Sequence, residues 1–266
     1  MTLFAILLGT LAAGIGSVWL AAALSFGVLA RYTQHMLSLA AGALLGTALL
    51  HLLPEAFESG IEAHALFLTL LVGVVFFFLL DKAELWHHGH EHHQHGADAA
   101  LAHAGHDHHD HHDHGRATGS WAVLAGDSVH CFGDGVLIAS AFMAELQLGV
   151  IAAVAVLAHE VPHHMGDLTV LRAAGGTRRA ALVKVTLAGA ITALGGLLGY
   201  WLIEQLRDYH PYFLVVASGS FIYVALADLI PQLQKRLRPA ETLTQVAWLL
   251  AGIALVTLAS ALMHRH

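Results

Sequence analysis

Histidines and carboxylates recur at helical spacing inside apolar stretches of this 266-residue chain. His130 and Asp134 are four residues apart in one stretch, and His159 and His163 are four apart in another. Residues with this spacing share one face of a helix. Imidazole and carboxylate groups are ligands for a tetrahedral, borderline-soft dication such as zinc. We therefore predict a metal site on two neighbouring helices, with His130, Asp134, His159 and His163 as ligands.

Further polar side chains flank these four residues. Cys131 and Glu160 each follow a ligand by one position, so we expect them to face a neighbouring position for a second ion or a proton. Pro162 removes a backbone hydrogen bond inside its helix, which suits a polar site better than a lipid-facing surface. The predicted metal set is His130, Cys131, Asp134, His159, Glu160 and His163, and the candidates for pathway or supporting roles are His51, Glu55, Asp127, His164 and Asp167.

The composition indicates that these residues belong to a membrane protein. Hydrophobic residues make up 57% of the chain and charged residues 12%, and the mean hydropathy is +0.65. This is too little polar surface for a soluble protein of this size. An ionisable side chain at the centre of a bilayer helix costs about 2.5–3.5 kcal/mol. A hydrogen-bonded core residue is the simpler explanation for any one of them, but their joint pattern favours metal coordination, which satisfies several acceptors at once.

Apolar stretches long enough to cross a bilayer, about 20 residues each, predict an all-α membrane protein. Their short connections favour one eight-helix transmembrane bundle, with three helices in 1–86 and five in 120–266. The first stretch has no charge before Arg31, unlike a signal peptide, so we expect it to be retained. The eight predicted helices are 2–30, 34–58, 62–86, 120–143, 148–172, 178–206, 212–234 and 243–263.

The charges predict the orientation of this bundle. Lys and Arg flank alternate connections, for example at Lys82, Arg172 and Arg178, whereas acidic residues such as Glu145 and Glu204 flank the others. Positively charged connections usually lie in the cytoplasm. We therefore expect both termini to be extracytoplasmic and the chain to be a multi-pass protein of the plasma (inner) membrane.

The long connection 87–119 is rich in His and Asp and has no apolar periodicity. Such a segment cannot bury enough surface to fold alone, so we predict a disordered cytoplasmic loop. It would either bind metal ions loosely or serve as a solvated linker. No basic patch indicates nucleic acid as a partner. Because Cys131 is the one cysteine, an intrachain disulfide is excluded.

At the ligand stretches the sequence resembles the ZIP (Zrt/Irt-like) family of metal transporters. The stretch HCFGDG from His130 is similar to the fourth-helix motif HNFxDG of the family, and HEVPH from His159 is similar to the fifth-helix motif HEIPHE. HLLPEA from His51 and the stretch 220–228 also agree. The resemblance implies eight helices, outward termini, a His-rich loop after the third helix, and a transport site on helices four and five. Cys131 stands where the family usually has Asn, and His164 where Glu is common.

The function implied is transport of divalent metal ions, with zinc first and cadmium, iron(II) or manganese after it. We expect uptake into the cytoplasm by alternating access, with the ion as substrate, no cofactor and no enzymatic activity. The expected partners are the ions and the lipid bilayer, and a homodimer is left open. The alternative is an intramembrane zinc metalloprotease, because His159 to His163 also form an HExxH motif. Pro162 within the motif and the second ligand pair at His130 and Asp134 argue against it.

Overall fold

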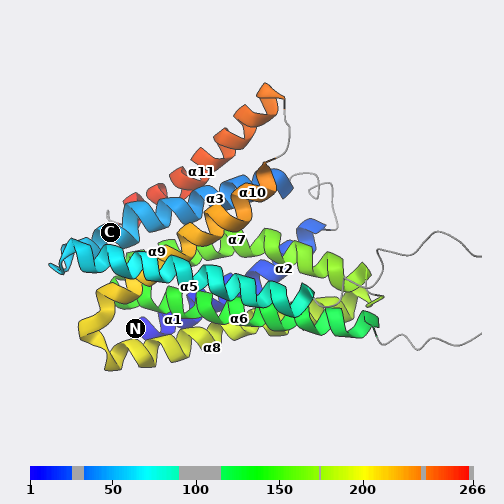
Figure 1. Ribbon diagram of the computed structural model, residues 1–266, viewed down its shortest axis with the longest axis horizontal. Helices are drawn as coiled ribbons and strands as arrows, with labels where there is room; N and C mark the ends of the chain where they lie inside the picture. Colours follow the sequence, from blue (N-terminus) through cyan, green and yellow to red (C-terminus); the bar gives the residue numbers. More distant parts are fainter. Residues whose placement is uncertain (26–32, 90–114, 174, 235–237, 264–266) are drawn as a thin grey trace, which may run out of the picture.

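The computed structural model is a bundle of long helices that run back and forth along one axis (Figure 1). It describes residues 1–25, 33–89, 115–173, 175–234 and 238–263, and these contain no β-strand. The all-helical prediction is therefore confirmed for the described chain. The long unbroken helices are α5 (Ala63–Gly89), α6 (Gly115–Ala144), α7 (Leu146–Ala173), α8 (Arg178–Gln205) and α11 (Pro239–Met263).

Three other stretches contain a wide π-helical turn between two α-helical halves, which the apolar pattern did not predict. Each such turn holds one more residue than an α-helical turn. A short 3-10 turn, η4 (Arg207–Tyr209), precedes the third stretch, which begins at His210. The three stretches are α1 (Thr2–Leu11), η1 (Ala12–Gly16) and α2 (Ser17–Ser25); α3 (Thr33–Thr47), η3 (Ala48–Leu52) and α4 (Leu53–Glu58); and α9 (His210–Tyr223), η5 (Val224–Leu229) and α10 (Ile230–Leu233).

Seven described helices are long and apolar enough to cross a membrane. The long helix outside this set is α6, which carries Asp127, His130 and Asp134 among its apolar residues. Charged side chains lower the hydropathy of a helix whether or not it crosses a bilayer. The structure thus supports seven spans by length and composition, and the eighth stays a prediction.

The predicted loop 87–119 is too long at both ends. Residues 87–89 continue helix α5, and residues 115–119 form the start of α6. Extending an existing helix gains a hydrogen bond without a new nucleus, so a helix can continue beyond the apolar run that predicts it. The rest of the predicted loop, 90–114, lies outside the described residues, as do 26–30 of the first predicted helix.

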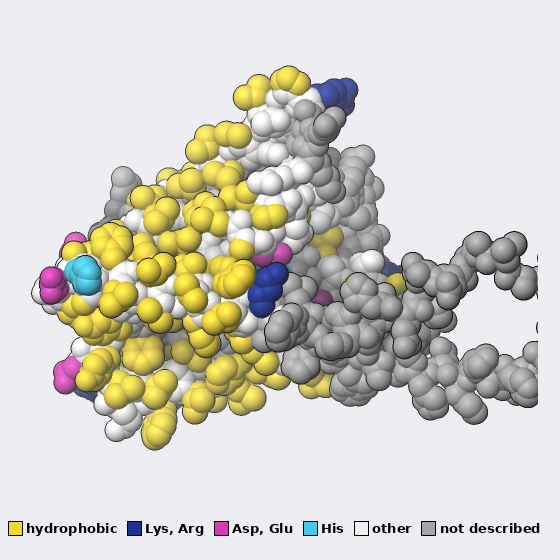
Figure 2. All heavy atoms as spheres, viewed as in Figure 1, with side chains coloured by type: hydrophobic (Ala, Val, Ile, Leu, Met, Phe, Trp, Pro, Cys, Tyr) yellow, Lys and Arg dark blue, Asp and Glu magenta, His cyan; other side chains and the backbone are white. Residues whose placement is uncertain are grey.

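Helix α7 lies at the centre of the bundle. In its most apolar segment 67% of residues are buried inside the protein, as in the span Thr33–Glu58, against 11% for α5 and 17% for α11. Figure 2 shows hydrophobic side chains over most of the described part of the face in view. Phe67 and Leu258 are examples of large hydrophobic side chains that are exposed in the described chain. An apolar exterior around a more polar central helix is the arrangement expected in a bilayer.

Glycines bring particular helices into backbone contact. A Cβ atom added at Gly135 of α6 would lie 2.0 Å from the carbonyl oxygen of Thr192 in α8, and one at Gly195 would lie 2.1 Å from the carbonyl of Phe132. Small residues at such crossings are typical of membrane helices. This contact fixes α6 against α8 beside the segment that carries the predicted ligands.

Candidate metal centre

Helices α6 and α7 carry the predicted ligands and run in opposite directions. Glu145 alone separates the end of α6 from the start of α7, so the two helices form a tight hairpin. Helix α7 continues through Pro162. Ligands near the middle of one helix therefore face ligands near the middle of the other.

The first ligand group consists of His130, Asp134, His159 and Glu160, whose ligand atoms lie within 4.8 Å of one another. His159 Nε2 is 3.2 Å from Asp134 Oδ2 and 3.3 Å from Glu160 Oε1. His130 Nε2 is 3.2 Å from Glu160 Oε1 and 3.3 Å from His159 Nε2. A tetrahedral zinc ion with bonds of about 2.1 Å separates its ligand atoms by about 3.4 Å. These four distances are close to that separation, and the distance from His130 Nε2 to Asp134 Oδ2 is wider, at 3.9 Å.

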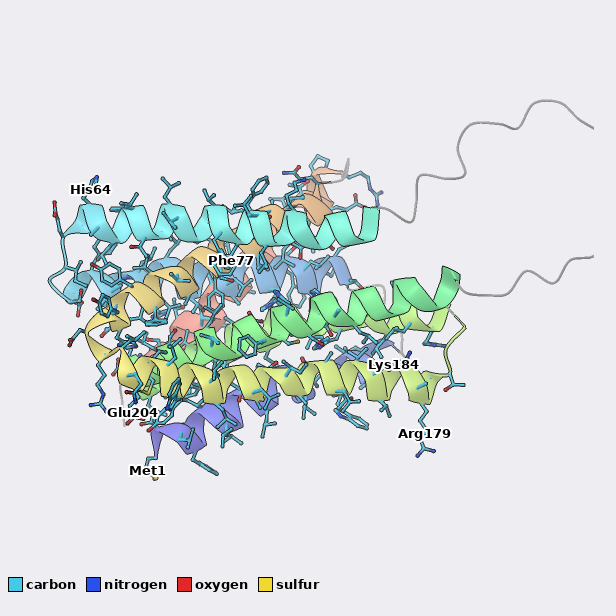
Figure 3. The ribbon with its side chains drawn as sticks, turned by 60° about the horizontal axis from the view of Figure 1, so that its bottom comes forward. Met1, His64, Phe77, Arg179, Lys184 and Glu204 are labelled. Carbon is cyan, nitrogen blue, oxygen red and sulfur yellow. The ribbon has the colours of Figure 1, made fainter. Side chains whose placement is uncertain are left out.

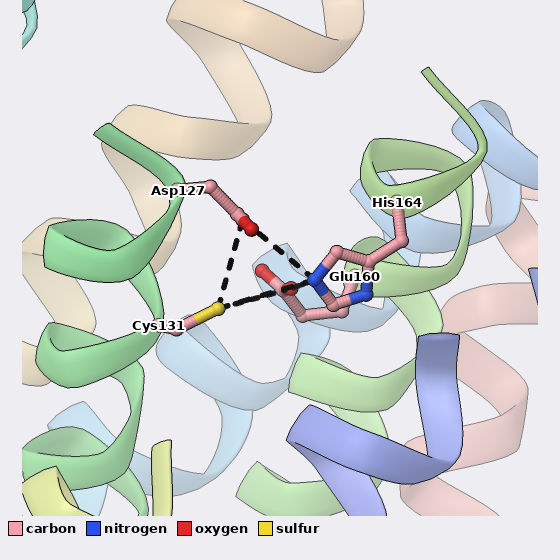
Figure 4. Close-up of side chains that lie close together, drawn as sticks. All are labelled: Asp127, Cys131, Glu160 and His164. Carbon is pink, nitrogen blue, oxygen red and sulfur yellow. Dashed lines mark hydrogen bonds and ion pairs between the residues drawn. The ribbon is translucent and has the colours of Figure 1, made fainter. Parts of the chain in front are cut away.

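The second group, Asp127, Cys131, Glu160 and His164, adjoins the first (Figure 4). His164 Nε2 is 3.0 Å from Glu160 Oε2 and 3.6 Å from Asp127 Oδ1. Cys131 Sγ is 3.6 Å from Asp127 Oδ1 and 3.8 Å from Glu160 Oε2. All four side chains are buried. Because Glu160 offers one oxygen to each group, its carboxylate joins the two.

The third group contains Asp127, His163 and Asp167. His163 Nε2 is 3.9 Å from Asp127 Oδ1 and 3.7 Å from Asp167 Oδ2. The His163 side chain is 35% exposed, whereas that of Asp127 is 1% exposed. The His163 ring also stacks on that of His130, with centroids 5.3 Å apart. Asp127 thus belongs to both the second and the third groups.

Hydrogen bonds at the far side of two rings fix which imidazole nitrogen faces each group. Ser17 Oγ lies 2.7 Å from the Gly14 carbonyl and 3.0 Å from His164 Nδ1. A hydroxyl has one hydrogen, which the Gly14 carbonyl must receive, so Ser17 accepts from Nδ1–H of His164. His159 Nδ1 likewise faces the carbonyl of Ala155 at 3.4 Å. When these rings are neutral, Nδ1 carries the hydrogen and Nε2 presents its lone pair to the ligand groups, as in metal-binding histidines.

The cluster has an excess of acceptors. In the three groups, four acidic side chains meet four histidines and one thiol. Among the described residues, four buried carboxylate oxygens have no hydrogen-bond partner: Asp127 Oδ2, Asp134 Oδ2, Glu160 Oε1 and Asp167 Oδ2. Buried acceptors without donors are costly, and a bound dication removes that cost. The arrangement is therefore suited to binding cations.

The structure places the predicted ligands in different groups from those that the i,i+4 spacing predicts. His130, Asp134 and His159 lie in one group, but Glu160 takes the fourth place there and His163 belongs to the third group. Glu160 is long enough to reach α6 from the edge of the predicted face, and its two oxygens serve two groups. His51 and Glu55 lie on the stretch from η3 to α4, outside these groups.

Ser17 supports the metal centre through His164, and the sequence did not predict this role. It lies just after the π-helical turn of the first span, 147 residues before His164 in the chain. A serine in the Gly-rich run AGIGS is a weak signal, because small residues at helix contacts are common. Its role follows only from the contact between the first span and α7.

Comparisons with known proteins identify relatives of this chain. A family model described as "ZIP Zinc transporter" matches residues 1–260. The chain is 29% identical over 280 residues to "Zinc transporter ZIP13" of Pongo abelii, which covers 96% of this chain and 77% of that protein. It is 37% identical over 119 residues to "Zinc transporter ZIP10" of Homo sapiens, which covers 45% of this chain and 14% of that protein. "Zinc transporter ZIP4" of Homo sapiens is 37% identical over 115 residues, which cover 43% of this chain and 18% of that protein.

Proposed function

Because this chain belongs to the ZIP zinc transporter family, we propose that it carries zinc into the cytoplasm through the ligand groups of α6 and α7. The observation that supports this most directly is the pair of adjoining groups that share Glu160. Imidazole, thiol and carboxylate together suit zinc and cadmium, and the carboxylates also allow iron(II) and manganese. The ion is the substrate of this process.

The distribution of charge supports the proposed orientation. Met1, His64 and Glu204 lie at one end of the bundle, and Arg179 and Lys184 lie at the other (Figure 3). By the positive-inside rule, the end with Arg179 and Lys184 is cytoplasmic. In this proposal α6 is the eighth span, held in the bundle by its glycine contacts with α8, and both termini are extracytoplasmic.

The membrane potential supplies a driving force in this direction. A divalent cation that moves inward across about 100 mV gains roughly 4.6 kcal/mol, twice the value for one charge. The ligands must also release the ion, so the groups are expected to open alternately to each side while α6 and α7 move together. Placement in the plasma (inner) membrane, a homodimer and metal binding by the His-rich stretch stay predictions.

The metalloprotease alternative is not supported. A protease with an HExxH motif uses both histidines on one ion and its Glu to activate water. Here His159 and His163 belong to different ligand groups, and Glu160 lies among the ligands of two. The relatives named above are zinc transporters.

Zinc uptake into vesicles that contain the purified protein tests the function. We expect Asp134→Asn to reduce the uptake rate by at least about 100-fold, since it removes a charged ligand from the first group. Glu145→Gln is the matched control, because Glu145 is an exposed carboxylate in the turn between the same two helices. Wild-type vesicles that take up no more zinc than empty ones would contradict the proposal. Equal uptake by the two variants would contradict the site.

A further inference from the structure

We propose that Asp127, His163 and Asp167 form a third cation position, through which the ion passes between the two buried groups and the basic end of the bundle. This inference rests on the proposed function and extends it with a site on the pathway. It differs from the predicted four-ligand site, because Asp167 and Asp127 take part and His130 and Asp134 do not.

The distances fit coordination better than hydrogen bonding. His163 Nε2 lies 3.7 Å from Asp167 Oδ2 and 3.9 Å from Asp127 Oδ1. Both distances exceed the usual range of a hydrogen bond from nitrogen to oxygen, about 2.7–3.2 Å. They are close to the separation of about 3.4 Å between ligands of a tetrahedral zinc ion, and a larger ion widens that separation. Three ligand atoms arranged in this way leave room for a cation between them.

Two buried oxygens give independent support. Asp127 is 3% exposed and Asp167 is 8% exposed, and one carboxylate oxygen of each has no hydrogen-bond partner among the described residues. For Asp167 this oxygen, Oδ2, is the one that faces His163. An i,i+4 pair on a solvated helix face would leave its carboxylate open to water. A buried carboxylate without a donor is instead a candidate ligand for a cation.

The third position lies beyond the other two groups along the helices. On α7 the ligands follow one another as His159, Glu160, His163, His164 and Asp167, and Asp167, the last of them, lies about 12 Å beyond His159 along the helix axis. Helix α6 runs the opposite way, so the ligand sequence from Asp134 to Asp127 leads toward the same end. That end is the one where Arg179 and Lys184 lie (Figure 3).

Shared carboxylates connect successive positions. Glu160 belongs to the first and second groups, and Asp127 belongs to the second and third. An ion can therefore move from one group to the next without leaving all of its ligands. His163 is 35% exposed while His164 of the second group is 0% exposed. The third position is thus the most accessible one, as a point of entry or release requires.

Anomalous X-ray diffraction from crystals of the full chain soaked with cadmium tests the position directly. Wild-type protein should show a cadmium peak between Asp127, His163 and Asp167. In Asp167→Asn this peak should be lost while the peaks at the first two groups remain, which also shows that the variant is folded. Asp208→Asn, a change at an exposed Asp in η4, just beyond the far end of α8, should keep all peaks. A wild-type map without the third peak, or an unchanged peak in Asp167→Asn, would overturn the proposal.

Uptake kinetics separate this proposal from the function on which it rests. Loss of an exit position should slow release, so we expect the maximal zinc uptake rate of Asp167→Asn to fall about tenfold, with the half-saturating concentration changed less than about twofold. A wild-type protein that shows the third cadmium peak but no uptake would refute the function and leave the position. Normal uptake kinetics in Asp167→Asn would refute the position and leave the function.

Discussion

Replacing Ser17 with alanine tests whether the first span orients a metal ligand on α7, the His164 ring. Ser17 and His164 are both 0% exposed, and the Ser17 hydroxyl accepts from Nδ1–H of the ring at 3.0 Å. Alanine removes this acceptor and leaves a buried N–H without a partner. The ring can then turn away, or its proton can move to Nε2, where it occupies the lone pair that faces Glu160 and Asp127.

The expected size of the effect follows from this hydrogen bond. An unsatisfied buried donor costs about 1–3 kcal/mol. Loss of a group that orients a metal-binding histidine usually weakens metal affinity by about 10-fold to 100-fold, which corresponds to about 1.4–2.7 kcal/mol. We therefore expect the zinc concentration for half-maximal uptake by Ser17→Ala to rise by about one to two orders of magnitude, with the protein still folded.

The assay is uptake of radiolabelled zinc into vesicles over a range of zinc concentrations. Ser38→Ala is the matched control, because Ser38 is also 0% exposed and its hydroxyl donates only to the carbonyl of Gln34 in its own helix, at 3.0 Å. Ser17→Thr, which keeps a hydroxyl, should retain more affinity than Ser17→Ala. If Ser17→Ala and Ser38→Ala have the same half-saturating concentration, the orienting role of Ser17 is refuted.

Three further predictions concern selectivity, packing and the His-rich stretch. Cys131→Asn should keep zinc uptake but weaken competition by cadmium relative to manganese, since it replaces a soft ligand with a harder one; an identical competition profile would argue against a ligand role for the thiol. Gly135→Ala should lower stability in a thermal melt by about 1–3 kcal/mol or more, because the new Cβ meets the Thr192 backbone at 2.0 Å. Gly133→Ala, whose Cβ meets nothing within 4 Å, should not. Deleting 90–114 should leave maximal uptake within severalfold of wild type, and a complete loss would move the site into that stretch.

The locations of the membrane-spanning helices could be predicted from the sequence, because length and hydropathy determine them. Apolar runs of about 20 residues locate the spans, because the bilayer requires that length and leaves few alternatives. The π-helical turns, such as Ala48–Leu52, have no comparable signal. They depend on how one helix packs against others, which the sequence of a single span does not contain.

The ligands were predictable as a set, whereas their division into groups was not. The i,i+4 spacing places His130 and Asp134 on one face of α6, where the structure also has them together. Which residues of α7 meet that face depends on the rotation and depth of one helix against the other. Contacts between residues far apart in the chain hold each helix in place, such as Gly135 against Thr192 for α6 and Ser17 against His164 for α7. Glu160 therefore joins two groups and His163 faces Asp167, although spacing alone pairs His163 with His159.

The wide turn at Ala12–Gly16 also bears on how insertions and deletions are tolerated in the first span. Before it, Thr10 packs beside Gly196 of α8, and after it, Ser17 reaches His164 of α7. The wide turn absorbs the rotation of its extra residue, so deleting one residue inside it would restore ordinary α-helical winding and leave the two halves in nearly the same relative rotation. Both contacts could then persist, so a related chain with a one-residue gap at this turn should still be able to keep the serine that orients the histidine.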